Sequence, residues 1–239
     1  MDDITVRARR ARGTRRSVST PSSDQGEVAV PRVRSGSIPV SGRKGRWLEK
    51  KNAIVKAASR LFSERGFNYV SLDDVAEQLG IGKPVIYYYF ESKEQILFEC
   101  YSLAFDVGDE VMRTALALEG DARTRLEYYL REYLLAHLRG EAPLVPMHDI
   151  LALSEPLRGI IERRRRNRRD RLRKLIAAGQ EDGSLGPCDP RVAVSAWGGA
   201  SAWVIGSFDP RKGLSPEETA EYMVGLFLNG LLPRKKVAK

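Results

Sequence analysis

The sequence predicts an all-α protein, in which a small three-helix unit with a helix-turn-helix precedes a larger helical domain. Apolar residues recur at helical spacing from Trp47 to about residue 230, and no alternating strand pattern of useful length interrupts them. Two short helical stretches joined by a glycine-containing turn lie within residues 71–90, an arrangement typical of helix-turn-helix units. With 239 residues and 42% hydrophobic content, the chain can bury one sizeable core or two modest ones.

The two ends of the chain differ from the rest in composition and charge. Residues 1–45 are rich in Arg, Ser, Gly, Pro and Val without any helical or strand period, so they cannot bury enough apolar surface to offset the entropy of ordering. We therefore expect a disordered basic N-terminal extension over 1–45. Residues 1–46 hold eleven Lys/Arg and four Asp/Glu, which accounts for most of the net charge of +9. A short basic tail at 233–239 ends the chain.

Helix caps mark the first two helices of the small domain, which we place at residues 46–92. A helix over 47–65 is predicted because apolar residues share one face and Gly66 follows as a C-cap. These apolar residues are Ile54, Ala58, Leu61 and Phe62. Ser71 is suited to cap a second, short helix, whose first turn carries two aspartates at the positive end of the dipole. Gly80 ends that helix.

A third helix begins at Lys83, where Pro84 is tolerated in the first turn. Helical geometry places Ile86, Tyr89 and Phe90 on one side, where Ile86 and Phe90 can anchor the helix to the first two. A packed aromatic cluster is the simplest interpretation of the Tyr-Tyr-Tyr-Phe run, but three consecutive tyrosines cannot all face one core. The side chains left toward solvent are Lys83, Pro84, Val85, Tyr87 and Tyr88.

The larger domain, which we place at residues 93–232, reads as helix almost throughout. Gly and Pro residues punctuate it and Ser92 is suited to cap its first helix. The predicted helices span 93–118, 122–139, 147–153, 155–178, 190–207 and 215–230.

Helix 155–178 contains an arginine-rich run, which in most proteins is a solvated face. Here, however, Arg165 and Arg168 fall on the same stripe as the apolar residues Ile161, Leu172 and Leu175. Arginines on an apolar stripe require anionic partners, so both are candidates to bind ligand phosphates or a carboxylate.

The segment SLDDVAEQLGIGKPVIYYYFESKEQIL resembles the N-terminal domain of the TetR/AcrR family of transcriptional regulators. The resemblance covers about residues 47–100 and includes Phe62, Gly66-Phe67, Leu79-Gly80-Ile81, Tyr87-x-x-Phe90 and Ser92-Lys93-Glu94. It implies that Lys83, Pro84, Val85 and Tyr87 lie at base edges, that Tyr88 and Lys93 contact phosphates, and that Ser71 assists. Pro84 and Val85 replace the more usual Gly and Ser/Thr, and an apolar Val85 favours a thymine methyl group.

The same resemblance implies a homodimer formed through helices 190–207 and 215–230, bound to a palindromic operator with half-sites about one DNA turn apart. It also implies a small-molecule effector. The region from Pro156 to Gly225 is similar to regulators of lipid, fatty-acid and sterol catabolism that sense acyl-CoA thioesters. By that likeness Trp197 and Trp203 would line the ligand pocket with Arg165 and Arg168. The alternative is that both tryptophans are ordinary core or interface residues.

Other classes of function have little support in the sequence. The only histidines, His137 and His148, lack metal-ligand spacing, no nucleotide-binding or nucleophile motif is present, and we expect neither an enzyme nor a cofactor. Cys100 and Cys188 are expected to be reduced thiols. No apolar run suggests a membrane span or a secretory signal, which predicts a cytoplasmic protein. A ligand-free architectural protein remains an alternative, in which the basic extension binds DNA with little sequence preference.

Overall fold

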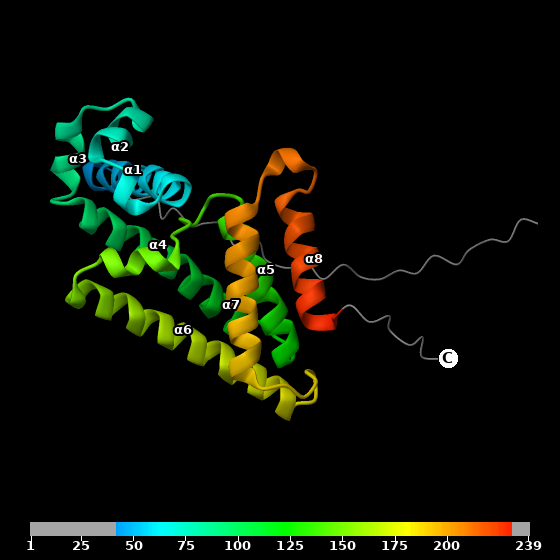
Figure 1. Ribbon diagram of the computed structural model, residues 1–239. Helices are drawn as coiled ribbons and strands as arrows, with labels where there is room; N and C mark the ends of the chain where they lie inside the picture. The colour runs from blue at the N-terminus through cyan, green and yellow to red at the C-terminus, as the bar shows by residue number, and fades with distance from the viewer. Residues whose placement is uncertain (1–41, 231–239) are drawn as a thin grey trace, which may run out of the picture. The chain divides into compact units, whose positions relative to one another are not determined.

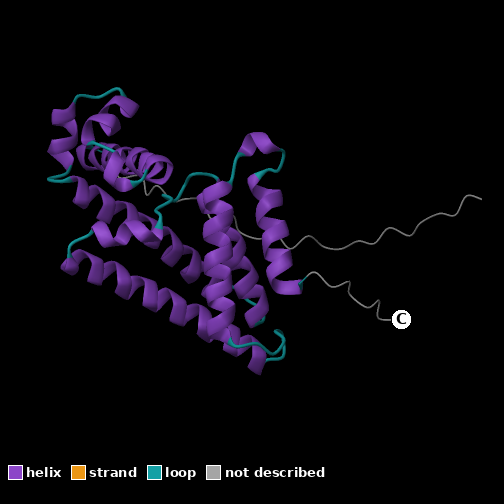
Figure 2. Cartoon of the chain, in the orientation of Figure 1, coloured by secondary structure: helices purple, strands orange, loops and turns teal. Residues whose placement is uncertain are grey.

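The computed structural model describes residues 42–230. The extension expected over 1–45 therefore lies outside the described residues except for 42–45, and so does the tail at 233–239. Within this range all regular structure is helical and no strand is present (Figure 2). The all-α prediction is confirmed. None of the helices between residues 42 and 230 combines the length and the apolar character that a bilayer span requires.

The small N-terminal unit consists of α1 (Arg43–Arg65), the 3₁₀ turn η1 (Phe67–Tyr69), α2 (Leu72–Leu79) and α3 (Lys83–Tyr89). Helix α1 begins four residues before the predicted start because its first turn is Arg-Lys-Gly-Arg, which carries no apolar pattern. Gly66 ends α1 as expected, with φ at 84° and its amide donating to the Phe62 carbonyl at 2.9 Å. Such a positive φ is readily available only to glycine.

Local hydrogen bonds hold α2 at both ends. The Ser71 hydroxyl accepts a hydrogen bond from the Asp74 amide at 3.1 Å, while the Asp74 carboxylate accepts one from the Ser71 amide at 2.7 Å. This reciprocal capping box satisfies two amides that would otherwise be unpaired. At the other end Gly80 adopts the left-handed conformation, and the Ile81 amide donates to the Ala76 carbonyl. The turn between α2 and α3 is therefore fixed by local chemistry.

The larger domain starts with the long helix α4 and ends with α7 and α8. Its elements are α4 (Lys93–Ala117), α5 (Ala122–Leu138), η2 (Met147–Ala152), α6 (Glu155–Glu181), α7 (Pro190–Ser207), η3 (Pro210–Lys212) and α8 (Pro216–Asn229). The helix predicted at 147–153 is a 3₁₀ helix, which suits a segment only six residues long. Figure 1 shows α1, α2 and α3 grouped around the start of α4, with α7 and α8 beside α5.

Helix α6 extends three residues beyond its predicted end at 178. The glycine that follows this position, Gly179, is buried inside the helix instead of ending it. A Cβ at Gly179 would lie 2.5 Å from Cδ1 of Leu185. The side chain of Leu185 therefore occupies the space that any side chain at position 179 would need. The helix ends at Glu181, and Gly183 takes the positive φ of the following turn.

Two hydrophobic clusters form the core, and α4 contributes to both. The first joins α1, α2 and α3 to the first half of α4, and also includes Ile150, Leu153 and Ile161. The second joins the second half of α4 to α5, α6, α7 and α8. The boundary expected between residues 92 and 93 therefore does not separate the cores, because α4 completes the N-terminal one.

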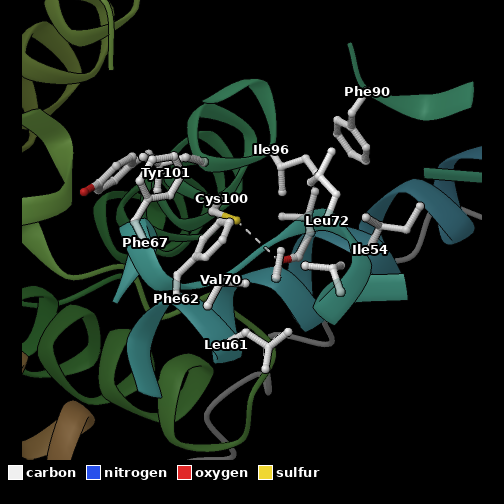
Figure 3. Packing of buried hydrophobic residues seen from close by; sticks show 14 of the residues in the cluster. Ile54, Leu61, Phe62, Phe67, Val70, Leu72, Phe90, Ile96, Cys100 and Tyr101 are labelled. Carbon is white, nitrogen blue, oxygen red and sulfur yellow. Dashed lines mark hydrogen bonds between the residues drawn. The ribbon is translucent and has the colours of Figure 1, made fainter. Parts of the chain in front are cut away.

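Figure 3 shows how closely α4 is built into the N-terminal core. Cys100 of α4 lies among Phe62, Val70 and Ile96, and its thiol donates a hydrogen bond to the Val55 carbonyl of α1 at 3.4 Å. Burial raises the pKa of the Cys100 thiol, which keeps it protonated. Both cysteines are free, as expected, with Cys188 exposed.

Candidate DNA interface and effector pocket

Helix α3 presents one side to the core and the other to solvent. Ile86 and Phe90 are 0% and 1% exposed, whereas Tyr87 and Tyr88 are 51% and 72% exposed. Lys83, Pro84 and Val85 are exposed as well. The orientation predicted from helical geometry is thus confirmed, and five candidate contact residues share the outward side of α3.

Tyr89 fastens α3 to α1. Its ring is half-buried, and the ring centroid lies 5.5 Å from that of Trp47 and 5.0 Å from that of Tyr88, which it meets edge-on. Tyr89 therefore anchors the helix, whereas Tyr87 and Tyr88 keep exposed side chains that are available for contacts outside the chain.

The amino group of Lys83 forms an ion pair with Asp73. Its Nζ lies 2.7 Å from Oδ2 of Asp73 in the first turn of α2, and this hydrogen bond raises the pKa of Lys83. Lys83 can reach a base edge only by leaving Asp73. Asp73 therefore influences how Lys83 is presented, a role that the sequence pattern did not indicate.

The two remaining candidates for DNA contact flank the helix-turn-helix. The Ser71 hydroxyl is exposed but takes part in the capping box with Asp74. Nζ of Lys93, at the start of α4, lies 4.2 Å above the ring of Phe67, and partial burial lowers the pKa of Lys93. A cation held on an aromatic face keeps a defined position.

Tyr69 is an exposed aromatic residue that the sequence analysis did not single out. Its side chain is 86% exposed and lies two residues before Ser71, between the buried Phe67 and Val70. Phe67 and Val70 are buried and the two residues between them are exposed, but a single 3₁₀ turn is too short for this spacing to have been recognised from the sequence. Tyr69 joins the candidate DNA contacts because it borders the same end of α2 as Ser71.

The larger domain has a cavity of about 460 Å³ that is open to solvent and is lined by α4, α5, α6, α7 and residues 143–145. Arg165 and Arg168 of α6 and Trp197 of α7 all line it, so the structure brings three of the four predicted ligand residues together. This volume is within the usual range for small-molecule pockets. The arginines reach the cavity because they share the buried stripe of α6 with Ile161 and Leu172.

The prediction for Trp203 needs correction. Trp203 does not line the cavity and its side chain is 77% exposed. It follows Trp197 by six residues, which corresponds to about 240° around a helix, so the two tryptophans face different directions. Trp203 belongs instead to the outer face of α7.

The cavity lining is cationic and aromatic. Three arginines line it, since Arg169 joins Arg165 and Arg168, and no Asp or Glu is among the lining residues that the structure describes. Tyr133 and His137 of α5 also line it, with ring centroids 4.7 Å apart. The sequence analysis missed these two residues because it assessed the histidines only as metal ligands.

His137 is a neutral group in this cationic setting. Burial, and then the charge of Arg168, lower the pKa of His137 to about 3. Neither ring nitrogen forms a hydrogen bond with the described part of the chain, although the Pro143 carbonyl lies near enough to oppose part of the pKa shift. The positive charge of the cavity therefore comes from its arginines.

The outer faces of α7 and α8 carry large apolar side chains. Exposure is 65% for Val192 and 77% for Trp203 on α7, and 66% for Tyr222 and 45% for Leu226 on α8. Small residues such as Gly199 and Gly206 lie between or beside those of α7. Exposed apolar groups on neighbouring helices mark a surface that can pack against a protein partner.

A helix-turn-helix with a solvent-facing α3, joined to a helical domain with a pocket, is the arrangement of a DNA-binding transcriptional regulator. The profile described as "Bacterial regulatory proteins, tetR family" matches residues 54–100, and the profile described as "Tetracyclin repressor-like, C-terminal domain" matches residues 119–231. A TetR/AcrR-family regulator from Thermobifida fusca YX-ER1 is 32% identical in sequence. Its structure covers 77% of this chain and is itself covered completely, with a TM-score of 0.56. The chain belongs to the TetR family.

Three further proteins resemble this chain. The structure of AibR in complex with isovaleryl coenzyme A and operator DNA is 26% identical, with 75% of this chain and 98% of AibR covered and a TM-score of 0.66. The regulator YhgD of Bacillus subtilis (strain 168) is 23% identical over 61% of this chain and 76% of its own length. The activator FasR of Mycolicibacterium smegmatis is 33% identical, but the match spans only 33% of this chain and 36% of FasR. All three are named for regulation or operator binding and none for catalysis.

Proposed function

We propose that this protein is a repressor that binds a palindromic operator as a homodimer and releases it when a small molecule occupies the cavity. One observation carries the proposal: the same chain presents an exposed α3 and an arginine-lined cavity, and α4 contributes to the cores around both. Such a protein acts where the chromosomal DNA is, in the cytoplasm.

The outer faces of α7 and α8 are the proposed dimer interface. The exposed Val192, Trp203, Tyr222 and Leu226 would be buried against the same residues of a second copy, forming an isologous four-helix contact. Two-fold symmetry would place two α3 helices about one DNA turn, ~34 Å, apart. The operator would then consist of two inverted half-sites.

Each exposed residue of the helix-turn-helix has a proposed role. Lys83, Pro84, Val85 and Tyr87 would meet base edges, whereas Tyr88 and Lys93 would bind phosphates and Ser71 would assist them. Lys93 lies outside α3, at the first position of α4, which supports a phosphate contact instead of a base contact for this residue. Phosphate contacts position a protein on DNA, and base contacts determine the sequence that it prefers.

An acyl-CoA thioester is the proposed effector. Such a molecule combines phosphates with an apolar acyl group, and the cavity combines three arginines with aromatic and aliphatic side chains. The resemblance to AibR, whose structure contains isovaleryl coenzyme A, supports this choice. Binding would shift the population of dimers toward a geometry in which the two α3 helices no longer match successive major grooves.

Selection of bound fragments from a random DNA pool, at one salt concentration near physiological, tests the proposal. We expect an inverted repeat with half-sites about one turn apart, and loss of this binding when isovaleryl-CoA or a longer acyl-CoA is added. Recovery of DNA without any shared motif would instead favour the architectural alternative. Transcription from a promoter that carries the selected site then distinguishes repression from activation.

Substitution of Lys93 tests the division of roles. We expect Lys93→Ala to weaken binding to operator and unrelated DNA alike and to reduce the slope of log K against log salt by about 0.9 per subunit, or about 1.8 for the bound dimer, because each subunit loses one phosphate contact. Lys83→Ala and Tyr87→Phe should instead change the preferred sequence. Lys174→Ala, an exposed lysine on α6, is the matched control. An unchanged salt slope for Lys93→Ala would contradict the phosphate contact.

A further inference from the structure

Arg168 lies against two aromatic rings in the cavity. Its guanidinium carbon lies 4.4 Å from the ring centroid of Phe105 on α4 and 5.3 Å from that of Tyr133 on α5. Two aromatic rings from two other helices therefore hold the group, and it lines the cavity with its remaining surface. Planar guanidinium groups stack on rings with their faces and bind oxygen ligands with their N–H edges.

No carboxylate neutralises Arg168 within the described residues. Its nearest acidic neighbour by electrostatic influence, Asp109 on α4, is already paired with Arg164 at 2.9 Å and Arg171 at 3.4 Å. Burial opposes the charge of Arg168, but Tyr133, Tyr129 and Asp109 raise its pKa, so it stays protonated. Arg168 is half-buried, and a cation partly removed from water without a paired anion is costly, which is why such arginines are normally found with an anionic partner.

Gly108 makes the space for this arrangement. A Cβ at this position on α4 would already touch Nη1 of Arg168 at 3.4 Å and the Tyr133 ring at 3.5 Å. These are ordinary van der Waals distances, so the position has room for a methyl group and for nothing larger. A larger side chain would displace Arg168 and Tyr133.

We infer that Arg168 is the anion-binding group of the effector pocket, and that the effector carries an anionic oxygen group which enters the cavity and pairs with its N–H edge. The inference rests on the proposed role of the cavity as the effector site. The ligand class is an anion on an apolar body, because aromatic and aliphatic side chains complete the lining. Carboxylates and phosphates share this chemistry. Gly108, Phe105 and Tyr133 position Arg168.

A pair of fluorescent probes isolates the contribution of the negative charge. 1-Anilinonaphthalene-8-sulfonate and N-phenyl-1-naphthylamine share one apolar body and differ in a single sulfonate. Affinities of both are measured for the full-length protein and for Arg168→Gln. We expect the ratio of the two affinities to shift against the sulfonate by about ten- to hundredfold in Arg168→Gln, because a charge-assisted hydrogen bond is lost.

Two further variants distinguish loss of the anion site from a general change in charge and from misfolding. Arg163→Gln removes an exposed charge from the same helix and should leave the ratio unchanged. Gly108→Leu retains Arg168 but displaces it, and should shift the ratio in the same direction as Arg168→Gln. Unchanged binding of the uncharged probe and an unchanged helical circular dichroism spectrum verify that each variant is folded.

Displacement of the sulfonate probe identifies the source of the anion. Displacement by decanoate points to a carboxylate, and displacement by isovaleryl-CoA but not by decanoate points to the phosphates of a thioester. The inference is overturned if Arg168→Gln leaves the ratio unchanged, if Arg163→Gln shifts it equally, or if the wild type does not bind the sulfonate probe.

Operator binding provides an independent readout. Operator selection by the wild type tests the proposed function separately from the probes. Failure of the wild type to select any operator would count against the proposed function alone, whereas the shifted probe ratio of Arg168→Gln supports the anion site irrespective of DNA binding.

Discussion

At the scale of single residues, neighbouring side chains determine the position and the charge of the functional groups. Lys83 is exposed on α3, yet Asp73 holds its amino group, and Lys93 lies on the ring of Phe67. In the cavity, Arg168 is charged while His137 beside it is neutral. Residue type alone therefore does not determine what each group can bind.

Replacing Asp73 with Asn should strengthen DNA binding. Lys83 would no longer be paired and could meet a base edge freely, so we expect affinity for the operator to rise by about two- to fivefold and affinity for unrelated DNA to rise less. Fluorescence anisotropy titrations at several salt concentrations measure both. Glu77→Gln removes an equal charge from α2 without contact to Lys83 and serves as the control. Equal effects of the two variants would show that the ion pair is irrelevant.

His137 should make stability depend on pH. Its folded-state pKa is lowered from 6.5 to about 3, so the unfolded chain binds a proton first as the pH falls, and this group's contribution to stability is present above pH 6.5 and is lost below it. The free energy of unfolding should fall by up to about 1.4 kcal/mol per pH unit between pH 6 and pH 5 because of this group.

Urea unfolding of His137→Phe across this range should show a correspondingly flatter profile. His148→Gln, at a histidine whose side chain is 77% exposed, should retain the slope of the wild type. A wild-type slope that survives in His137→Phe would mean that other groups cause it.

At the scale of elements, close contacts between helices and loops explain departures from local sequence signals. Gly179 is followed by two more helical residues because Leu185 packs where its Cβ would be. In the same helix, a Cβ at Gly159 would meet no side chain of another described element within 4 Å, so packing does not require a glycine there. Packing therefore requires glycine at position 179 of α6 and does not require it at position 159.

Alanine substitutions at these glycines should change stability in opposite directions. We expect Gly179→Ala to lower the free energy of unfolding by about 1–3 kcal/mol, because the methyl group overpacks Leu185. Gly159→Ala should raise it by about 0.5–1 kcal/mol through helix propensity. Chemical denaturation followed by circular dichroism measures both. Stabilisation by Gly179→Ala would mean that Leu185 can move aside at little cost.

At the scale of the whole molecule, assembly into a dimer would complete the structure. Apolar side chains on the outer faces of α7 and α8 are not covered by any other described helix. A single helix-turn-helix can contact only one half-site of an operator. Burial of these side chains and recognition of a palindrome are therefore two consequences of one proposed interface.

Trp203→Asp should separate the subunits. A buried charge replaces a large aromatic contact, so we expect the dimer to dissociate in sedimentation experiments and operator affinity to fall by about thirtyfold or more. Leu151→Asp changes another exposed apolar residue, 74% exposed on η2, and should leave both properties intact. A Trp203→Asp protein that remains dimeric would place the interface elsewhere.

The sequence alone specified the features that depend on neighbours along the chain. The caps at Gly66, Ser71 and Gly80, the outward side of α3 and the mixed stripe of Arg165 and Arg168 follow from helical periodicity and local hydrogen bonding. These signals were sufficient for the helical class, the helix-turn-helix and the residues of α3 that face solvent.

Tertiary packing, in contrast, established which distant residues meet. It placed Asp73 against Lys83, joined His137 and Tyr133 to the arginines of α6, and separated Trp203 from the cavity. Such outcomes depend on how the helices pack against one another, and helical periodicity specifies which face of a helix is buried without specifying the partner that covers it.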